Sequence, residues 1–148
     1  MTESITIKVV NTSGLALPSY ASPQSAGMDV RAALDAPVTI APGARVLIPT
    51  GLRVELPAGY EIQMRPRSGL ALRNGITLLN TPGTIDADYR GEIGVILINL
   101  SDTPFTVERG DRICQMVVAP CLQACWLPCE SLENSERSTG GFGHSGIK

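Results

Sequence analysis

Two carboxylates and an aromatic ring lie close together in the stretch GTIDADYRGEIGVILINL, Gly83 to Leu100. Asp86 and Asp88 are two residues apart, so on an extended backbone their side chains share one face while Tyr89 points to the other. Turn chemistry explains the Asp and Gly residues of a hairpin, but it does not explain an aromatic residue beside two carboxylates. We therefore interpret this polar stretch as the reactive tip of a β-hairpin that continues into an apolar strand.

A possible anion-binding group surrounds the segment PRSGLALRNG, residues 66–75. The pattern predicts one short helix, in which Ser68 caps the first turn and Gly75 follows the last residue. Leu70 and Leu72 are expected to point inward. The start of a helix presents unpaired N–H groups, and three arginines surround this one: Arg65, Arg67 and Arg73. We expect a phosphate group here; a capped surface turn with solvated arginines is the alternative.

Glycines surround a single phenylalanine in the segment RSTGGFGHSG, residues 137–146. Successive glycines let backbone N–H groups approach phosphate oxygens, and Arg137 adds a guanidinium group. Phe142 has no neighbouring apolar residues, and its ring can stack on a base. We interpret the segment as a nucleotide lid, with a disordered linker as the alternative. His144 receives no role.

Composition favours one globular domain. The chain has 148 residues, with 43% hydrophobic and 18% charged, enough to bury a core. Fifteen Gly and eleven Pro against few aromatics indicate short strands and sharp turns. The net charge of −2 argues against a general nucleic-acid or membrane surface, so an anionic ligand must be held locally. We assign residues 1–136 to the domain and residues 137–148 to a flexible active-site lid of the same domain.

The N-terminus and the cysteines are used to predict the cellular compartment of the protein. MTESITIKVVN lacks a basic region followed by an apolar stretch, and no apolar run approaches membrane length. We therefore expect no secretory signal and a cytoplasmic protein. The four cysteines lie in the last third of the chain: Cys114, Cys121, Cys125 and Cys129. A helix would align three of these thiols on one face, but prolines interrupt this segment. We therefore expect reduced thiols, with a zinc site as the minor alternative.

Short β-prone segments recur at intervals of about 8–12 residues with Gly and Pro turns between them. This spacing predicts an all-β sandwich, jelly roll or barrel and argues against a parallel α/β fold. The expected strands are residues 5–10, a short segment within 26–33, two or three segments among 38–40, 45–49 and 52–56, then 60–65, 94–100, 105–107, a segment within 109–120, and 121–126.

Two of these strands carry informative positions. Gly94 to Leu100 is rich in β-branched residues without helical periodicity, so we expect it to be buried on both faces. Gln115 interrupts the apolar run within residues 109–120, and it is either satisfied by backbone groups or directed at a ligand. Asp29 follows Gly27 at the start of another strand, where a simple turn carboxylate also explains it.

Five segments in this order resemble the homotrimeric dUTPases: AGMDVRAA, PRSGLAL, GTIDADYRGEIGV, RGDRICQMV and RSTGGFGHSG. The resemblance spans nearly the whole chain, from residue 26 to residue 146. It implies a distorted jelly-roll or β-clip protomer and a homotrimer whose active sites are each built by several chains. It also implies Mg²⁺-dependent hydrolysis of dUTP to dUMP and pyrophosphate, which limits uracil in DNA and supplies dUMP for thymidylate synthesis.

The resemblance also implies roles for individual residues. Asp86 corresponds to the water-activating carboxylate, and Tyr89 to the ring that packs on deoxyribose and leaves no space for a 2′-hydroxyl. Asp29 corresponds to the carboxylate that contacts the metal through water. The uracil pocket corresponds to Asn80 and the backbone from Gly83, Thr84 and Ile85 to Tyr89. Positions that contact the triphosphate correspond to Arg67, Ser68, Gly69, Gln115, Arg137, Gly143 and Ser145, and Phe142 corresponds to the ring that covers uracil.

The chain departs from the family pattern at two positions. Ser138 stands where the family often has Gly, which affects how closely the backbone approaches phosphate. Cys114 stands where a small residue is common, and we expect little consequence.

Two other functions are compatible with the same fold: a dCTP deaminase and a nucleotide-sensing protein without turnover. Deamination needs a different acid and base at the nucleobase, and GTIDADYRGE with the glycine-rich tail fits the hydrolase better. A sensor does not need the water-activating Asp86. Release of ammonia from dCTP, or binding of a dUTP analogue without hydrolysis of dUTP, would favour these alternatives.

Overall fold

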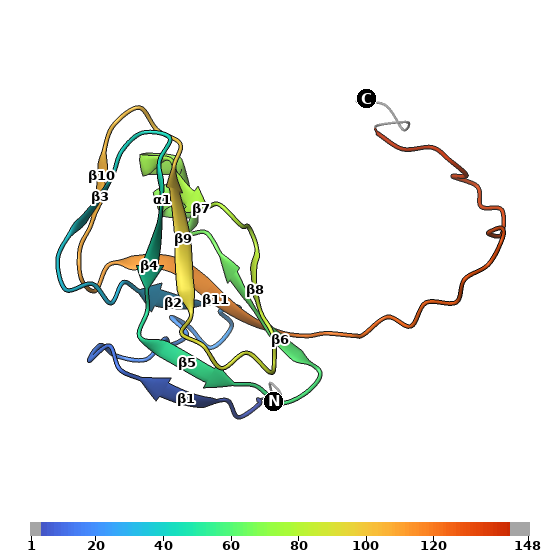
Figure 1. Cartoon of the computed structure of the whole chain (residues 1–148), viewed down its shortest axis with the longest axis horizontal. Coiled ribbons are helices and arrows are strands. Elements are labelled where there is room, and N and C mark those ends of the chain that lie inside the picture. The colour runs from blue at the N-terminus through green and yellow to red at the C-terminus, as the bar shows by residue number, and fades with distance from the viewer. Residues whose placement is uncertain (1–3, 143–148) are drawn as a thin grey trace.

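The computed structural model describes residues 4–142, and this part of the chain folds into short strands with one short helix (Figure 1). The all-β class and the single helix predicted from the sequence are therefore confirmed. The strands form two larger antiparallel sheets, and two strand pairs complete the body. Within residues 4–142, no helix has the length and apolar character needed to cross a bilayer.

One sheet carries five of the predicted site residues and has the strand order β2-β11-β6-β8. Its strands are β2 (Met28–Arg31), β11 (Arg112–Pro120), β6 (Tyr60–Arg65) and β8 (Gly83–Ile85). Side chains alternate between two faces along each strand. One face is apolar and packs into the core through Val30, Ile62, Met64 and Met116. The other face is polar, and it carries Asp29 and Gln115.

The second sheet has the order β4-β9-β7, with β4 (Arg45–Pro49), β9 (Gly94–Asn99) and β7 (Ile76–Leu78). In β9, Val95 and Leu97 are buried, whereas Ile96 and Ile98 on the other face are only half-buried. The prediction of burial on both faces is therefore wrong for the isolated chain. No element of the described chain covers the outer face, and Leu47 of β4, opposite Ile96, is 64% exposed.

Two strand pairs close the body around the core. β1 (Lys8–Asn11) pairs with β5 (Leu52–Glu55), and β3 (Val38–Ile40) pairs with β10 (Phe105–Val107). The largest fully buried apolar side chains come from strands and loops of the whole body: Ile40, Ile48, Ile62, Ile76, Ile93, Leu97 and Ile113. Close packing of this aliphatic core fixes the sheets relative to one another, so the loops that carry the predicted site residues begin at fixed strand ends.

The helix α1 (Ser68–Asn74) joins β6 to β7 and differs from its predicted form at the first turn. Arg67 is the N-cap residue and Ser68 is already helical, so no side chain caps the first turn. Leu70 is half-buried against the core, but Leu72 is 89% exposed because the helix lies on the surface. The predicted end is confirmed: Gly75 has φ 63° and donates its N–H to the Ala71 and Leu70 carbonyls.

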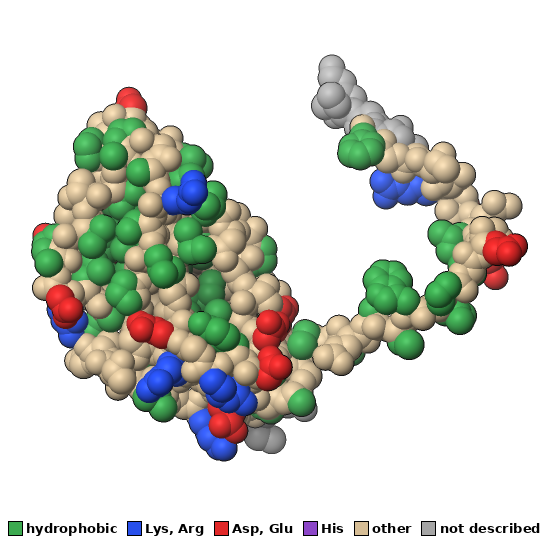
Figure 2. Space-filling model, viewed as in Figure 1, with side chains coloured by type: hydrophobic (Ala, Val, Ile, Leu, Met, Phe, Trp, Pro, Cys, Tyr) green, Lys and Arg blue, Asp and Glu red, His purple; other side chains and the backbone are tan. Residues whose placement is uncertain are grey.

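After Pro120 the chain leaves the body as an extended arm, residues 121–142 (Figure 1). The strand predicted over Cys121 to Trp126 is wrong. The Cys121 N–H donates to the Gly59 carbonyl at 2.9 Å, but the segment pairs with no strand among the described residues. The space-filling view shows apolar side chains along the arm (Figure 2). The large exposed ones are Leu122, Trp126, Leu127, Leu132 and Phe142. An arm with this composition lacks a packing partner within its own described chain.

Candidate active site

A row of polar residues crosses the sheet at the carboxyl end of β6. Gln115 lies opposite Asp29 on one side and opposite Arg65 on the other. Directly opposed residues of antiparallel strands share a face, so the three side chains lie on the polar face of the sheet. Two arginines pair with the carboxylate: Arg67 Nε lies 3.1 Å from Asp29 Oδ1, and Arg112 Nη1 lies 3.1 Å from Oδ2.

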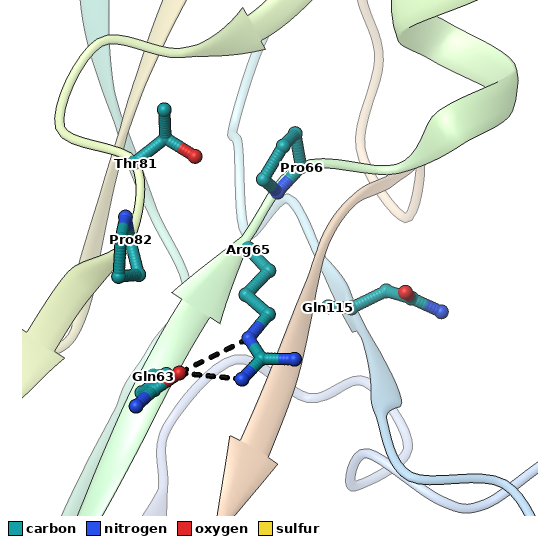
Figure 3. A pocket seen from close by; sticks show the side chains of 6 residues that line it. All are labelled: Gln63, Arg65, Pro66, Thr81, Pro82 and Gln115. Atoms are coloured by element: carbon teal, nitrogen blue, oxygen red, sulfur yellow. Dashed lines mark hydrogen bonds between the residues drawn. The ribbon is translucent and has the colours of Figure 1, made fainter. Parts of the chain in front are cut away.

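A pocket of about 470 Å³ opens beside this row (Figure 3). It is lined by Gln63, Arg65, Pro66, Thr81, Pro82 and Gln115. Arg65 donates two hydrogen bonds to Gln63 Oε1, at 3.1 and 2.6 Å, which hold its guanidinium group along β6 (Figure 3). The Gln115 side chain forms no hydrogen bond within residues 4–142, so its amide is available to a ligand. This outcome supports the second reading of Gln115.

The sequence reading grouped Arg65 with the arginines around the expected phosphate but did not single out Gln63. The structure places both beside Gln115, in the lining of one pocket. The signal was the alternation in YEIQMR, which puts Gln63 and Arg65 on the face opposite Ile62 and Met64. Alternation does not reveal which strand lies beside this one. In the structure the neighbour is β11, which brings Gln115 to the same face.

The segment predicted as a hairpin tip connects two different sheets. β8 pairs with β6, whereas β9 pairs with β4 and β7, so Gly83 to Leu100 does not form a hairpin. The polar residues form a turn in which the Tyr89 N–H donates to the Asp86 carbonyl at 3.2 Å. Asp86 is exposed, and Tyr89 is 43% exposed. The correction leaves both side chains accessible at the end of β8.

The residues predicted to bind uracil lie together before this turn. Asn80 is exposed, and its side chain lies directly over Gly83: a Cβ atom at Gly83 would be 3.1 Å from Asn80 Nδ2 and 3.3 Å from Met64 Cβ. Glycine is therefore needed at this close approach. Thr84 is exposed opposite Gln63, and Ile85 is half-buried.

The structure does not bring Asp86 together with the arginine group, Arg65, Arg67 and Arg112, that lies around Asp29 and Gln115. Gly83 lies opposite Met64 and Ile85 opposite Ile62, so β8 runs away from Arg65 as it approaches Asp86. Four residues of β6 separate the level of Asp86 from that of Arg65, about 13 Å along the strand. The carboxylate and the residues predicted to bind phosphate therefore lie at opposite ends of β6 in one chain.

A third group of predicted site residues lies on the arm, away from the body (Figures 1 and 2). Arg137 Nε donates to the Gly140 carbonyl at 2.7 Å, and the Gly140 N–H returns a bond to the Arg137 carbonyl at 3.0 Å. Ser138 and Phe142 both have φ 46°, a conformation that glycine adopts with less strain. Gly143 and Ser145, also predicted to bind phosphate, lie outside the described residues.

Cys114 lies beneath the polar row, on the core side of β11. The pKa of its thiol is raised to about 12, mainly because the thiol is buried. The nearby Asp29 carboxylate also raises this pKa, and the Arg67 guanidinium lowers it by a smaller amount. The thiol is therefore protonated at physiological pH. Cys125 and Cys129 are exposed on the arm. Within residues 4–142, the cysteines do not gather with other ligand side chains into a group of three that could hold a metal.

We expect this difference to control alkylation of the native protein. Only the thiolate reacts with iodoacetamide, so Cys114 should be unmodified at pH 8 while Cys125 and Cys129 are labelled. Peptide mass spectrometry before and after unfolding in guanidinium chloride measures the pattern. Modification of Cys114 in the folded protein at the rate of the arm cysteines would contradict its placement in the core.

Comparisons with known proteins agree on one family. A model of the dUTPase family matches residues 14–146. A deoxyuridine 5'-triphosphate nucleotidohydrolase from Maricaulis maris is 59% identical over 137 residues, covering 91% of this chain and 90% of that relative. The enzyme of that name from Syntrophotalea carbinolica is 54% identical over 146 residues, covering 98% of this chain and 99% of that relative.

A solved structure agrees in fold. The dUTPase of Staphylococcus bacteriophage 80alpha with dUPNHPP superposes with a TM-score of 0.88 and 26% sequence identity. The match covers 97% of this chain and 100% of that chain. The expected jelly-roll, or β-clip, protomer is thereby confirmed.

Proposed function

Since the chain belongs to the dUTPase family and is a dUTP diphosphatase, we propose that Asp86 activates the water that attacks the α-phosphorus of dUTP. The observation that carries this role is an exposed carboxylate on the turn at the end of β8, where the Tyr89 N–H bonds to the Asp86 backbone carbonyl. A carboxylate so placed can orient a water molecule and accept its proton. In-line attack then releases pyrophosphate and leaves dUMP.

The arginine group binds the triphosphate in this proposal. Arg67 contributes a guanidinium group and Gln115 an amide. Ser68 and Gly69, the first residues of α1, directly follow Arg67 and would also contact the phosphates. Arg65 adds a second guanidinium group at the pocket. Fixed positive charge near the phosphates lowers the repulsion that an attacking water meets.

The donor set fits Mg²⁺ that is held mainly by water and substrate. Asp29 is the carboxylate of this group, and two arginines already occupy both of its oxygens. One paired carboxylate suits an ion that keeps several waters and binds substrate phosphates, and Asp29 would contact it through water. When bound, the ion neutralises charge on the triphosphate. The residues of the chain would supply the general base, the groups that orient the substrate and the lid that closes over it.

Nucleotide selection is proposed to come from the edge formed by β8. Asn80 and the backbone of Gly83, Thr84 and Ile85 would bind uracil, and the Tyr89 ring would exclude a 2′-hydroxyl group. Phe142 would cover the base when residues 137–148 close over the site. Its side chain is fully exposed on the arm.

We propose a homotrimer with shared active sites, and three exposed surfaces support it. The outer face of the β4-β9-β7 sheet presents Leu47 and Ile96. The arm presents Leu122 and Trp126. An apolar groove of about 860 Å³ on the body is lined by residues such as Ile7, Leu17, Tyr20, Met28 and Val118. Association of copies would cover these apolar surfaces and would bring Asp86 of one chain to the arginine group of another.

We also propose that the protein acts in the cytoplasm. Its four cysteines are free, and exposed thiols such as those of Cys125 and Cys129 persist in a reducing compartment. No nucleic-acid or membrane partner is proposed, because the chain carries a net charge of −2 and two of the clustered arginines, Arg67 and Arg112, are paired with Asp29.

Mixing two inactive variants tests the shared sites. We expect Asp86→Asn and Arg67→Ala to be almost inactive alone, and subunit exchange at equal amounts should restore activity at about a quarter of the sites. Each restored site would take Asp86 from one variant and Arg67 from the other. Light scattering would measure the trimer in the same samples. Activity equal to the average of the two variants alone would place both groups on one chain.

The activity itself is tested with dUTP, dTTP, dCTP and UTP, each with and without Mg²⁺. We expect release of pyrophosphate and the monophosphate from dUTP alone, with loss of turnover after chelation of the metal. Ammonia from dCTP, or an absence of pyrophosphate from dUTP, would reject the proposed function.

A further inference from the structure

The Tyr89 ring rests on a glycine that the turn itself does not require. Gly91 does not adopt the left-handed backbone seen at Gly51 and other turn glycines of this chain. A Cβ atom at Gly91 would overlap the Tyr89 ring, 2.5 Å from Cζ and 2.9 Å from Cε2. The missing side chain therefore provides the space that the hydroxyl-bearing end of the ring occupies.

The same end of the Tyr89 side chain is tied to Glu92, the residue that follows Gly91. Tyr89 Oη donates a hydrogen bond to the Glu92 carbonyl at 3.0 Å. The outer end of the ring thus lies against Gly91, and its hydroxyl group is held by Glu92. An aromatic side chain that is 43% exposed would otherwise have freedom to rotate at the surface.

Glu92 is itself anchored to the turn between β4 and β5. Its Oε1 accepts the Gly51 N–H at 2.8 Å. Gly51 has φ 67° and lies against the Ser13 backbone, where a Cβ atom would be 2.7 Å from the Ser13 nitrogen, so this turn has little freedom to shift. A displaced Glu92 would leave the buried Gly51 N–H without its acceptor.

The residue after Glu92 is clamped to the same turn. The Thr50 hydroxyl donates to the Ile93 carbonyl at 2.6 Å, and the Ile93 N–H donates to the Leu52 carbonyl at 2.8 Å. Thr50 and Ile93 are both buried. The segment from Tyr89 to Ile93 is therefore connected to the core through backbone and side-chain bonds that do not touch the substrate groups.

We propose that Gly91 and Glu92 are positioning residues that set the selectivity for a 2′-deoxyribose by fixing the Tyr89 ring. The inference rests on the proposed contact between Tyr89 and the sugar. A ring held in place by Gly91 and Glu92 keeps its position beside C2′ of the sugar, where a hydroxyl group then has no space. A ring that is displaced or mobile opens that space and admits a ribonucleotide.

The test is the ratio of kcat/KM for dUTP to kcat/KM for UTP. Displacements on the order of 1 Å at a reacting group change rates by up to about 100-fold, so Gly91→Ala should lower this ratio by about 10- to 100-fold. Glu92→Ala should lower it in the same direction, and Glu92→Gln should restore it, because the amide oxygen still accepts the Gly51 N–H. Glu108→Ala, an exposed carboxylate on another loop, is the control with an unchanged ratio.

The outcomes separate this inference from the function on which it rests. A simple loss of folding would lower both kcat/KM values together and leave their ratio unchanged. If Tyr89→Ala lowers the ratio but Gly91→Ala and Glu92→Ala do not, the positioning role is overturned and the sugar contact survives. If Glu92→Gln is as impaired as Glu92→Ala, hydrogen-bond acceptance is not its role. An unchanged ratio in Tyr89→Ala would overturn both proposals.

Discussion

Replacement of Asp86 by asparagine is expected to lower kcat for dUTP by about 10²–10⁴-fold, the usual contribution of a general base. The amide keeps the size of the side chain but does not accept the proton of the attacking water. Asp86 is exposed, and its carbonyl, which accepts the Tyr89 N–H, is unchanged by the substitution. The turn should therefore persist, and the affinity for a non-hydrolysable dUTP analogue should remain close to that of the unmodified enzyme.

Single-turnover kinetics with calorimetry of analogue binding separates these two effects. Asp102→Asn supplies the matched control, because Asp102 is an exposed carboxylate on a loop remote from β8. A near-normal kcat in Asp86→Asn would remove the assignment of the base. Loss of analogue binding together with kcat would instead assign Asp86 to substrate binding.

Removal of residues 137–148 should also lower turnover by a large factor, on the order of 10²-fold or more, because closure and orientation both depend on this segment. It carries the Arg137 guanidinium group, which would bind the terminal phosphate, and Phe142, which would cover the base. The described part of the segment is largely exposed and makes no contact with the core. The melting temperature of the body should therefore change little.

Two substitutions distinguish closure from a nonspecific effect of truncation. Arg137→Lys keeps the charge but loses the planar fork of donors, so it should impair phosphate binding substantially. Phe142→Ala should raise KM by removing a stacking contact. If the truncated enzyme turned over dUTP at the full rate, the segment would have no role as a lid. A large fall in melting temperature would show that it supports the fold.

Local patterns determined much of this protein. The alternation in YEIQMR and the β-branched run from Gly94 to Leu100 correctly predicted strands, and Asn74 with Gly75 correctly predicted the end of the helix. These features depend on side-chain periodicity and backbone conformation within a few residues. The five motifs also identified the family, because residues that bind one ligand recur in the same order along related chains.

The sequence patterns were less informative about which strands pair. Gly83 to Leu100 has the composition of a hairpin, yet β8 joins β6 while β9 joins β4 and β7. Cys121 to Trp126 has the composition of a strand, yet it has no partner in its own described chain. A strand forms only where another edge accepts its hydrogen bonds, and that edge comes from a distant part of the sequence.

The sequence by itself determined the chemical groups of the site and the local conformations that carry them. Only the tertiary structure decided their arrangement: Asp29, Gln115 and Arg65 in one row, and Asp86 at the other end of β6. The physical reason is that residue types and periodicity follow from local chemistry, whereas register and sheet order follow from how the whole chain buries its apolar faces.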